Sequence, residues 1–332
     1  MSRCIELDLN RHDDDDIDRR GFLKCMAWAG TGVVFAVTGC GVVTKRLGTR
    51  SASKATGSFT FVQISDSHIG FDKAPNKDVA ATLEACVARI NALAQRPAFV
   101  IHTGDHVHLS TPEEFDTVKQ ILGTIKTGEV LHVPGEHDVF VDQGRRYRQF
   151  FGKGSLGTGY YSFDTGGVHF LALSNVQASE AESTAANNGL GVLGAEQLAF
   201  IKKDLAAVSS DTPIVIFGHV PLLAVYPQWG WATEDSVQVL DALKRFGSVT
   251  ALNGHIHQLI SKTEGNVVMH TAASTAYPLH RPGNVAPEPL VVPAGTLPGR
   301  IGIRTVHFIR GSSSIALIDR SLAGSAIAPA AA

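Results

Sequence analysis

Metal-binding side chains stand beside glycines or at the ends of apolar runs in five short segments of this 332-residue chain. The five segments are Asp66-Ser67-His68, Gly104-Asp105, Gly135-Glu136-His137-Asp138, Gly218-His219 and Gly254-His255-Ile256-His257. They supply carboxylates and imidazoles, which are ligands that manganese, iron and zinc accept. One such segment would mean little, but five that converge would form a pocket for two metal ions.

Each of the five segments directly follows an apolar run that is typical of a β-strand. The runs are residues 61–64, 99–101, 130–133, 214–217 and 249–252. Ligands of α/β sheets collect outside the carboxyl ends of the strands. The five loops are therefore expected to meet at one edge of the fold.

From Phe59 onward, short apolar runs alternate with amphipathic stretches. Apolar residues at helical spacing predict helices over residues 78–93, 112–125, 194–208 and 235–246. The remaining apolar runs predict strands, including a hairpin around 165–167 and several strands after residue 249. This order favours an α/β fold in which two mixed sheets are flanked by helices.

The composition indicates one large domain. Hydrophobic residues make up 44% of the chain and charged residues 18%, which is enough to bury a sizeable core. Residues 41–332 hold 24 basic and 24 acidic residues, so the charge gives no reason to expect nucleic-acid binding. Three of the four cysteines precede residue 41 and leave Cys86 alone in the body, which excludes a disulfide framework there.

The segment Arg19-Arg20-Gly21-Phe22-Leu23-Lys24 precedes an apolar run, residues 25–37, that is too short to span a bilayer comfortably. It resembles a twin-arginine export signal, although Asp18 stands where Ser or Thr is commoner. The resemblance implies that the twin-arginine translocation machinery carries the folded protein to the periplasm.

Val37-Thr38-Gly39-Cys40 resembles a lipobox, whose cysteine is lipidated and anchors the protein to the membrane. An ordinary small-residue cleavage site nearby is the alternative, and the sequence leaves both open. The expected organisation is a signal segment at 1–40, a linker at 41–57, one domain at 58–320 and an Ala-rich disordered tail at 321–332.

The ordered set of five segments resembles the calcineurin-like metallophosphoesterases over residues 59–272. The resemblance implies a four-layer α/β/β/α sandwich and two metal ions, drawn from iron, manganese and zinc. It also implies hydrolysis of small-molecule phosphomonoesters or phosphodiesters by a metal-bridging hydroxide.

Carried over to this chain, the resemblance assigns a role to each polar residue of the five segments. Asp66, His68 and His257 would hold the first ion. Asp105 would bridge both ions, and Glu136, His219 and His255 would hold the second. His137 would act as general acid or hydrogen-bond a phosphate oxygen, and Asp138 would either orient His137 or cap the following segment.

Glu136 departs from the family, which usually has Asn at this position. Three carboxylates against two divalent ions leave a net charge of +1, whereas Fe³⁺ in place of one divalent ion restores +2. We therefore expect an iron-containing centre. Two alternatives remain open: a centre repurposed for other, including oxidative, chemistry, and a non-catalytic metal-binding protein of the cell envelope.

Some further residues near the five segments have two interpretations each. His108 has the spacing at which the purple acid phosphatase branch has a tyrosine ligand, but His106 and His108 also suit a variable loop. The aromatic segment 220–233, with Trp229 and Trp231, predicts either a substrate lid or simple packing. In the proline-rich segment 273–300, His280 and Arg281 are candidates to border the pocket.

Overall fold

The computed structural model describes residues 33–37, 42–46, 57–176, 191–283, 286–311 and 315–328. The chain forms two units, residues 1–47 and 48–332. In the first unit, β1 (Val33–Val37) pairs antiparallel with β2 (Val42–Arg46). The twin-arginine segment, Cys40 and residues 47–56 of the expected linker lie outside the described residues. Among the described helices, none combines the length and hydropathy that crossing a membrane requires.

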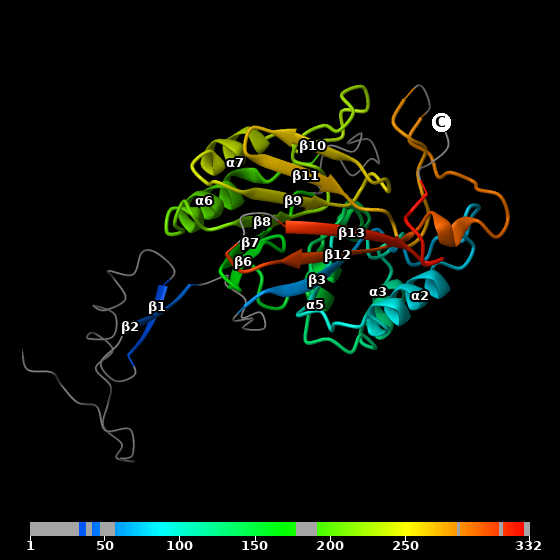
Figure 1. Ribbon diagram of the computed structural model, residues 1–332, viewed down its shortest axis with the longest axis horizontal. Helices are drawn as coiled ribbons and strands as arrows, with labels where there is room; N and C mark the ends of the chain where they lie inside the picture. The colour runs from blue at the N-terminus through cyan, green and yellow to red at the C-terminus, as the bar shows by residue number, and fades with distance from the viewer. Residues whose placement is uncertain are drawn as a thin grey trace, which may run out of the picture. The chain divides into compact units, whose positions relative to one another are not determined.

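The second unit contains two β-sheets (Figure 1). One sheet has the order β10-β11-β9-β8-β7-β6 and the other has the order β13-β12-β3-β4-β5. The first is built from β6 (Tyr161–Thr165), β7 (Val168–Ala172), β8 (Ile214–Phe217), β9 (Val249–Asn253), β10 (Ser261–Glu264) and β11 (Val267–Thr271). The second is built from β3 (Phe59–Ile64), β4 (Val100–His102), β5 (Val130–His132), β12 (Gly302–Phe308) and β13 (Ile315–Ser321). Each sheet contains both parallel and antiparallel pairs, so the expected mixed sheets are confirmed.

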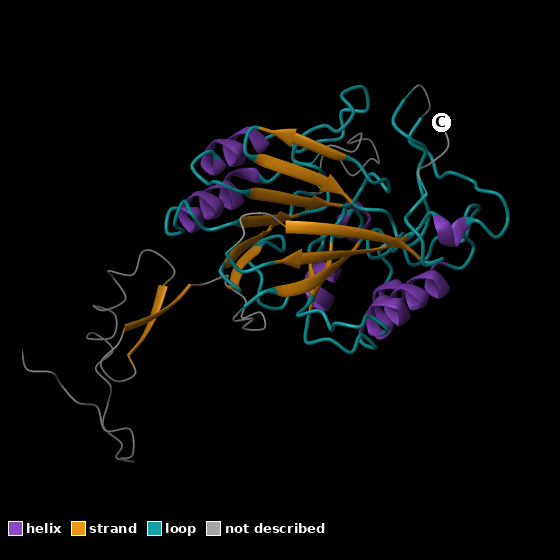
Figure 2. Cartoon of the chain, viewed as in Figure 1, coloured by secondary structure: helices purple, strands orange, loops and turns teal. Residues whose placement is uncertain are grey.

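The longer helices lie on the outer sides of the two sheets (Figure 2) and are α2 (Val79–Asn91), α3 (Pro112–Leu122), α6 (Gly194–Leu205) and α7 (Ser236–Leu243). The short helices α4 (Glu136–Val139) and α5 (Arg145–Phe151) follow β5, and a 3₁₀ turn, η1, lies at Leu297–Gly299. The start of α3 follows from its sequence, because Thr111 Oγ1 accepts from Glu114 N at 3.2 Å. In return, Glu114 Oε2 accepts from Thr111 N at 3.1 Å, which completes a capping box.

Three apolar layers hold the sandwich together. The central layer lies between the sheets and is rich in aromatic residues, with the Phe61 and Phe99 rings 4.9 Å apart and the Phe163 and Phe170 rings 4.6 Å apart. A second layer joins α2 and α3 to the five-stranded sheet, and a third joins α6 and α7 to the six-stranded sheet. The predicted α/β/β/α architecture is therefore confirmed.

The last described residues, 322–328, follow β13 and fall within the stretch expected to be a disordered tail. Leu322 N donates to Ile301 O at 2.9 Å, and Ala328 N donates to Gly299 O at 2.9 Å. These bonds hold the chain against η1 as far as residue 328. Their donors and acceptors are backbone groups, which every residue carries, so the sequence gives no sign of this pairing.

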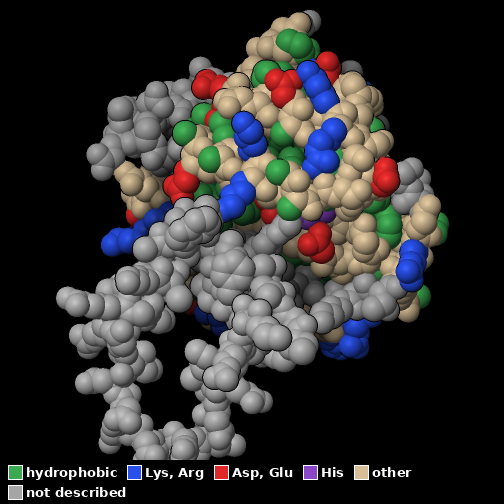
Figure 3. Space-filling view, turned by 90° about the vertical axis from the view of Figure 1, so that its left-hand side faces the viewer, with side chains coloured by type: hydrophobic (Ala, Val, Ile, Leu, Met, Phe, Trp, Pro, Cys, Tyr) green, Lys and Arg blue, Asp and Glu red, His purple; other side chains and the backbone are tan. Residues whose placement is uncertain are grey.

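On the face seen in Figure 3, basic and acidic side chains lie among one another.

Candidate metal centre

The five polar segments meet where strands of both sheets end. β3, β4 and β5 of one sheet and β8 and β9 of the other each deliver one segment at their carboxyl ends. The first group of candidate ligands is Asp66, His68 and His257, whose donor atoms lie within 4.8 Å of one another. His257 Nε2 is 3.2 Å from His68 Nε2 and 3.3 Å from Asp66 Oδ1.

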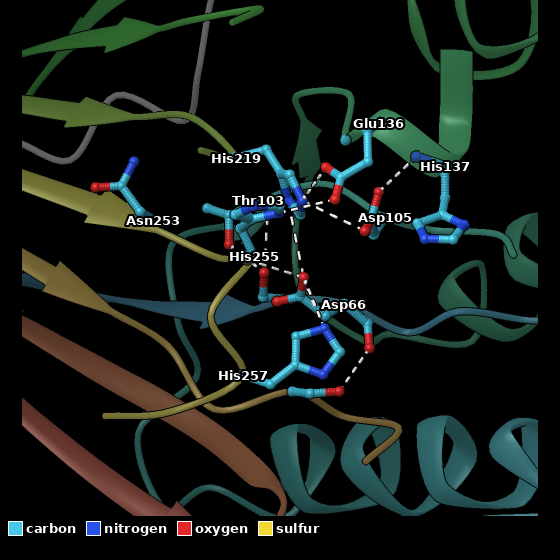
Figure 4. A network of polar contacts seen from close by, with 12 residues as sticks. Asp66, Thr103, Asp105, Glu136, His137, His219, Asn253, His255 and His257 are labelled. Atoms are coloured by element: carbon cyan, nitrogen blue, oxygen red, sulfur yellow. Dashed lines mark hydrogen bonds and ion pairs between the residues drawn. The ribbon is translucent and has the colours of Figure 1, made fainter. Parts of the chain in front are cut away.

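Glu136, His219 and His255 form the second group (Figure 4). The Glu136 carboxylate lies between the two imidazoles, with Oε2 2.8 Å from His219 Nε2 and Oε1 2.8 Å from His255 Nδ1. The two histidines are buried, whereas the Glu136 side chain is 41% exposed. The exposure belongs to the rest of the Glu136 side chain, because its Oε2 atom is buried beside His219.

Asp105 lies between the two groups. Its Oδ2 is 3.5 Å from His68 Nε2 and 3.3 Å from His219 Nε2. Its other oxygen, Oδ1, accepts a hydrogen bond of 2.9 Å from His137 N. The structure thus brings all seven candidate ligands together and puts one carboxylate at the centre, where a bridging ligand is needed.

The donor groups suit two transition-metal ions. Among the described residues, Asp66 Oδ2 and His255 Nε2 are buried without a hydrogen-bond partner. His219 Nδ1 donates to Thr103 O and His257 Nδ1 donates to Tyr277 O, both at 2.7 Å, which leaves each Nε2 directed at the centre. Metal-binding histidines are commonly oriented in this way, so the residues present fit a binuclear site.

The backbone is strained at five of the seven candidate ligands. Their φ angles are 54° at Asp66, 41° at His68, 54° at Asp105, 68° at His255 and 53° at His257. Non-glycine residues seldom adopt this left-handed conformation, and strain of this kind clusters at functional sites. The strained backbone therefore lowers the stability of the fold while it orients these side chains toward the centre.

Glycines make room for the ligands. A Cβ atom at Gly135 would clash with the backbone and carboxylate of Asp105, and a Cβ at Gly104 would lie 2.5 Å from His219 Nδ1. Gly104 also has a φ of 93°. The glycines in the sequence pattern thus allow the ligand loops to approach one another closely.

Burial and neighbouring charges shift the pKa values of several ligands. Burial, with help from the neighbouring imidazoles, holds the pKa of His68 well below its ordinary value, which keeps the ring neutral. Burial opposes ionisation of Glu136, but His255 and His219 hold the pKa of its carboxyl group well below the ordinary value. Neutral imidazoles and ionised carboxylates are the forms that bind metal ions.

His137 lies beside this centre and is partly buried. Its Nδ1 donates to His108 O at 2.8 Å, and its ring centroid is 4.8 Å from that of His68. Burial alone would lower the pKa of His137, but the carboxylates of Asp105 and Glu136 raise it above the ordinary value. A protonated imidazole here is suited to give a proton to a departing oxygen atom.

Asp138 does not hydrogen-bond to His137 in the described contacts, so it does not orient that ring directly. Its carboxylate accepts instead from Gly135 N at 2.8 Å, His106 N at 2.9 Å and His106 Nδ1 at 2.8 Å. It therefore ties the Asp105 loop to the Glu136 loop. His106 is buried and its Nε2 is 3.0 Å from His132 Nδ1, so it supports the loops from behind.

His108 lies at the edge of the centre. Its Nδ1 is 3.5 Å from His68 Nδ1, and its ring stacks on His137 with a centroid distance of 4.8 Å. Burial and the neighbouring His137 lower the pKa of His108 to about 4. His108 is therefore neutral and within reach of the centre, and it contacts both His68 and His137.

Asn175 and Tyr277 also contact candidate ligands and were not predicted from the sequence. Asn175 Oδ1 accepts from His219 N at 3.2 Å, and Asn175 Nδ2 donates to Val220 O at 2.6 Å. The available signal was an Asn shortly after the apolar run that contains β7. The Tyr277 ring lies 5.1 Å from the His68 ring at 30°, and no motif marks that position.

The aromatic segment predicted to be a lid or a packing element reaches the centre. The Trp231 ring lies 4.5 Å from the His255 ring, and the Trp229 ring lies 5.0 Å from Trp231. Both tryptophans are half-buried. The segment thus forms a wall that runs outward from one candidate ligand.

Residues 59–259 match the family model of the calcineurin-like phosphoesterases. The chain belongs to this family. The match spans all seven candidate ligands, from Asp66 to His257. It is an enzyme that hydrolyses phosphoric esters, as the family assignment implies.

Curated relatives are similar to the chain in sequence, and solved structures share its fold. The phosphoesterase is 26% identical over 227 residues to a probable glycerophosphodiester phosphodiesterase of Arcobacter nitrofigilis, covering 65% of this chain and 78% of the relative. It is 30% identical over 145 residues to a probable cyclic nucleotide phosphodiesterase of Rhodopseudomonas palustris, covering 43% and 50%. A dimetal phosphatase of Danio rerio has the same fold, with a TM-score of 0.55 at 17% identity over 79% of this chain and 99% of that one.

Proposed function

We propose that this phosphoesterase hydrolyses phosphodiesters of small molecules at a centre of two metal ions. The observation that carries the proposal is the place of Asp105, whose Oδ2 lies within 3.5 Å of a donor nitrogen in each ligand group. Two ions held on either side of that carboxylate would clamp phosphate oxygens and lower the pKa of a bound water.

The side chains around the centre have separate tasks in this reaction. Asp66, His68 and His257 would hold one ion, Glu136, His219 and His255 would hold the other, and Asp105 would contribute to both sites. His137 gives its proton to the departing ester oxygen, and the His108 carbonyl holds its ring in place through Nδ1. Asp138 fixes the spacing of the two loops that carry Asp105 and His137.

The names of similar proteins favour a diester over a monoester as the substrate. The two curated relatives described above are both named as phosphodiesterases. We therefore place phosphodiesters ahead of phosphomonoesters.

The test is hydrolysis of bis(p-nitrophenyl) phosphate and of p-nitrophenyl phosphate by residues 58–332, compared with Asp105→Asn. We expect turnover of the diester to exceed that of the monoester and to fall at least about a thousandfold in the variant. Asp116→Asn, the same replacement at an exposed position of α3, should keep the parent rate. Equal activity of parent and Asp105→Asn would overturn the proposal.

For the metals, we propose that Glu136 favours iron, with one ion as Fe³⁺. The extra negative charge is balanced when one divalent ion is replaced by a trivalent one. Metal content of the purified protein should show iron, and Glu136→Asn should lower the ratio of iron to zinc and manganese. An active protein that holds only zinc or manganese would contradict this.

For location, we propose export to the periplasm by the twin-arginine route, with Cys40 as a lipid anchor. The support is the Arg19–Lys24 segment and the tetrad that ends at Cys40. Replacing both arginines with lysine should keep the protein in the cytoplasm of a bacterial host. Cys40→Ser should move it from the membrane to the soluble periplasmic fraction, and an unchanged distribution would favour the ordinary cleavage site.

A further inference from the structure

A cavity of about 340 Å³ shares a wall with the metal centre. His257, a candidate ligand of the first ion, lines it. The other walls come from the residues after β9, the proline-rich segment 273–300, the aromatic segment through Val225, and residues 327–328. A volume near 340 Å³ falls within the range of small-molecule sites.

Two arginines, Arg281 and Arg300, line this cavity, and no carboxylate is among its lining residues. Both side chains carry a positive charge at neutral pH. Arginine presents a planar fork of donors that binds phosphate oxygens in pairs. The charged part of the cavity is therefore suited to a phosphate group.

The rest of the lining is largely apolar and includes Val225, Ile260 and Pro278. A free inorganic ion would gain nothing from these side chains. A phosphate attached to a carbon skeleton would bury that skeleton against them while its oxygen atoms meet the arginines.

Hydrogen bonds fix the walls of the cavity. His257 Nδ1 donates to Tyr277 O at 2.7 Å, and Tyr226 Oη donates to Gly283 O at 3.0 Å. Ala328 N donates to Gly299 O at 2.9 Å, next to Arg300. The segments that carry His257, Val225 and the two arginines are thus joined to one another, and the cavity is preformed.

We propose that this cavity binds a second phosphate, carried on one ester arm of the phosphodiester whose scissile phosphate lies at the metal centre. This inference rests on the proposed function, because it places one ester arm of the proposed phosphodiester substrate in the cavity. The substrates would then be phosphodiesters in which one alcohol bears a further phosphomonoester.

The test uses two esters that differ only in this group. One is the p-nitrophenyl ester of thymidine 5′-phosphate, and the other carries an additional 3′-phosphate. The parent enzyme should hydrolyse the second with a kcat/KM about 10- to 100-fold higher, mainly through KM. The double variant Arg281→Gln, Arg300→Gln should lose this preference while its hydrolysis of the first ester stays at the parent level.

Arg96→Gln, an exposed arginine outside the cavity, is the matched control and should keep the preference. An equal loss on both esters in the double variant would mean that the arginines maintain the fold rather than bind the arm, and would overturn the inference. Equal kcat/KM values of the parent for the two esters would overturn it as well.

Binding separates this inference from the proposed function. Calorimetric titration with thymidine 3′,5′-bisphosphate and with thymidine 5′-phosphate needs no turnover. If neither ester is hydrolysed but the bisphosphate binds about tenfold tighter in the parent alone, the cavity site stands and the proposed reaction fails. Equal affinities would overturn the cavity site whatever the activity.

Discussion

Buried histidines meet carboxylates in two regions of this molecule, and the two regions are built differently. At the carboxyl ends of the strands, His219 and His255 face Glu136, while His255 Nε2 has no hydrogen-bond partner in the described part of the chain. Near the amino end of β7, His169 donates from both ring nitrogens, to Asp164 at 2.8 Å and to Asp204 at 2.7 Å.

The two regions differ in whether their buried side-chain nitrogen and oxygen atoms all have hydrogen-bond partners. His169 has no ring nitrogen left to offer, and its backbone has no left-handed strain. At the metal centre, buried donor atoms face one another and five ligands are strained. A perturbed, buried histidine therefore does not by itself mark an active site, whereas unsatisfied donors on strained backbone do.

The largest difference in kcat is expected when histidine is replaced by asparagine in each of the two regions. His137→Asn should lower kcat about 100- to 10,000-fold for a diester with an alkyl leaving group such as glycerophosphocholine, because the alkoxide needs a proton. The loss should be smaller for bis(p-nitrophenyl) phosphate, whose phenolate leaves without one. His169→Asn should leave both rates at the parent level, and steady-state kinetics on the two esters measures all of these.

Equal losses on both esters in His137→Asn would contradict proton donation and leave only phosphate binding for His137. A large loss in His169→Asn at neutral pH would remove the distinction between the two regions.

A methyl group added at Gly135 should have an intermediate effect. Its Cβ would meet Asp105, so the loop must shift, at a cost of about 1–3 kcal/mol. We expect Gly135→Ala to lose about ten- to a hundredfold in kcat/KM and to bind metal less tightly, as measured by chelator competition. In Gly128→Ala the added Cβ would lie 3.6 Å from Ala98 O, so this control should behave like the parent.

His169 should affect stability and leave turnover unchanged. Burial opposes its protonation, but Asp164 and Asp204 raise the pKa of His169 to about 9. Because this folded-state pKa exceeds the unfolded value near 6.5, the contribution is complete below about pH 6.5 and is lost as pH rises through about 9. Since Asp164 is largely exposed, the contribution is at most about 3 kcal/mol.

Urea unfolding at several pH values measures this contribution. The parent should lose unfolding free energy between pH 7 and pH 10, and His169→Asn should lose less over the same interval. Parallel profiles for the two proteins would show that the pair with Asp204 contributes nothing to the pH dependence.

The sequence was most informative where chemistry needs a particular side chain. Asp66, Asp105 and His219 follow apolar runs that had to be strands, and the structure brings them together as expected. The supporting groups were out of reach of sequence reasoning, because Thr103 and Tyr277 act through backbone carbonyls that every residue has. Direct orientation of His137 by Asp138 was not found, since the Asp138 carboxylate accepts hydrogen bonds from four neighbouring N–H groups.

The ends of elements were less predictable than their existence. The helix expected over residues 235–246 is α7, Ser236–Leu243, and the helix expected over residues 112–125 is α3, Pro112–Leu122. Fraying turns and loop hydrogen bonds set these ends rather than apolar spacing. Arg300 was also missed, because its place in the cavity depends on packing between segments that are distant in the chain.

The imidazoles of His68 and His257 meet although 189 positions separate them along the chain. The first ligand group is therefore incomplete until residue 257 has been synthesised and the two sheets have docked. An ion bound there would close a loop of 189 residues. The unfolded chain does not bring these ligands together and so does not bind the ion in the same way. The free energy of unfolding should then rise with the logarithm of the free metal concentration, which makes metal supply a determinant of the lifetime of this fold.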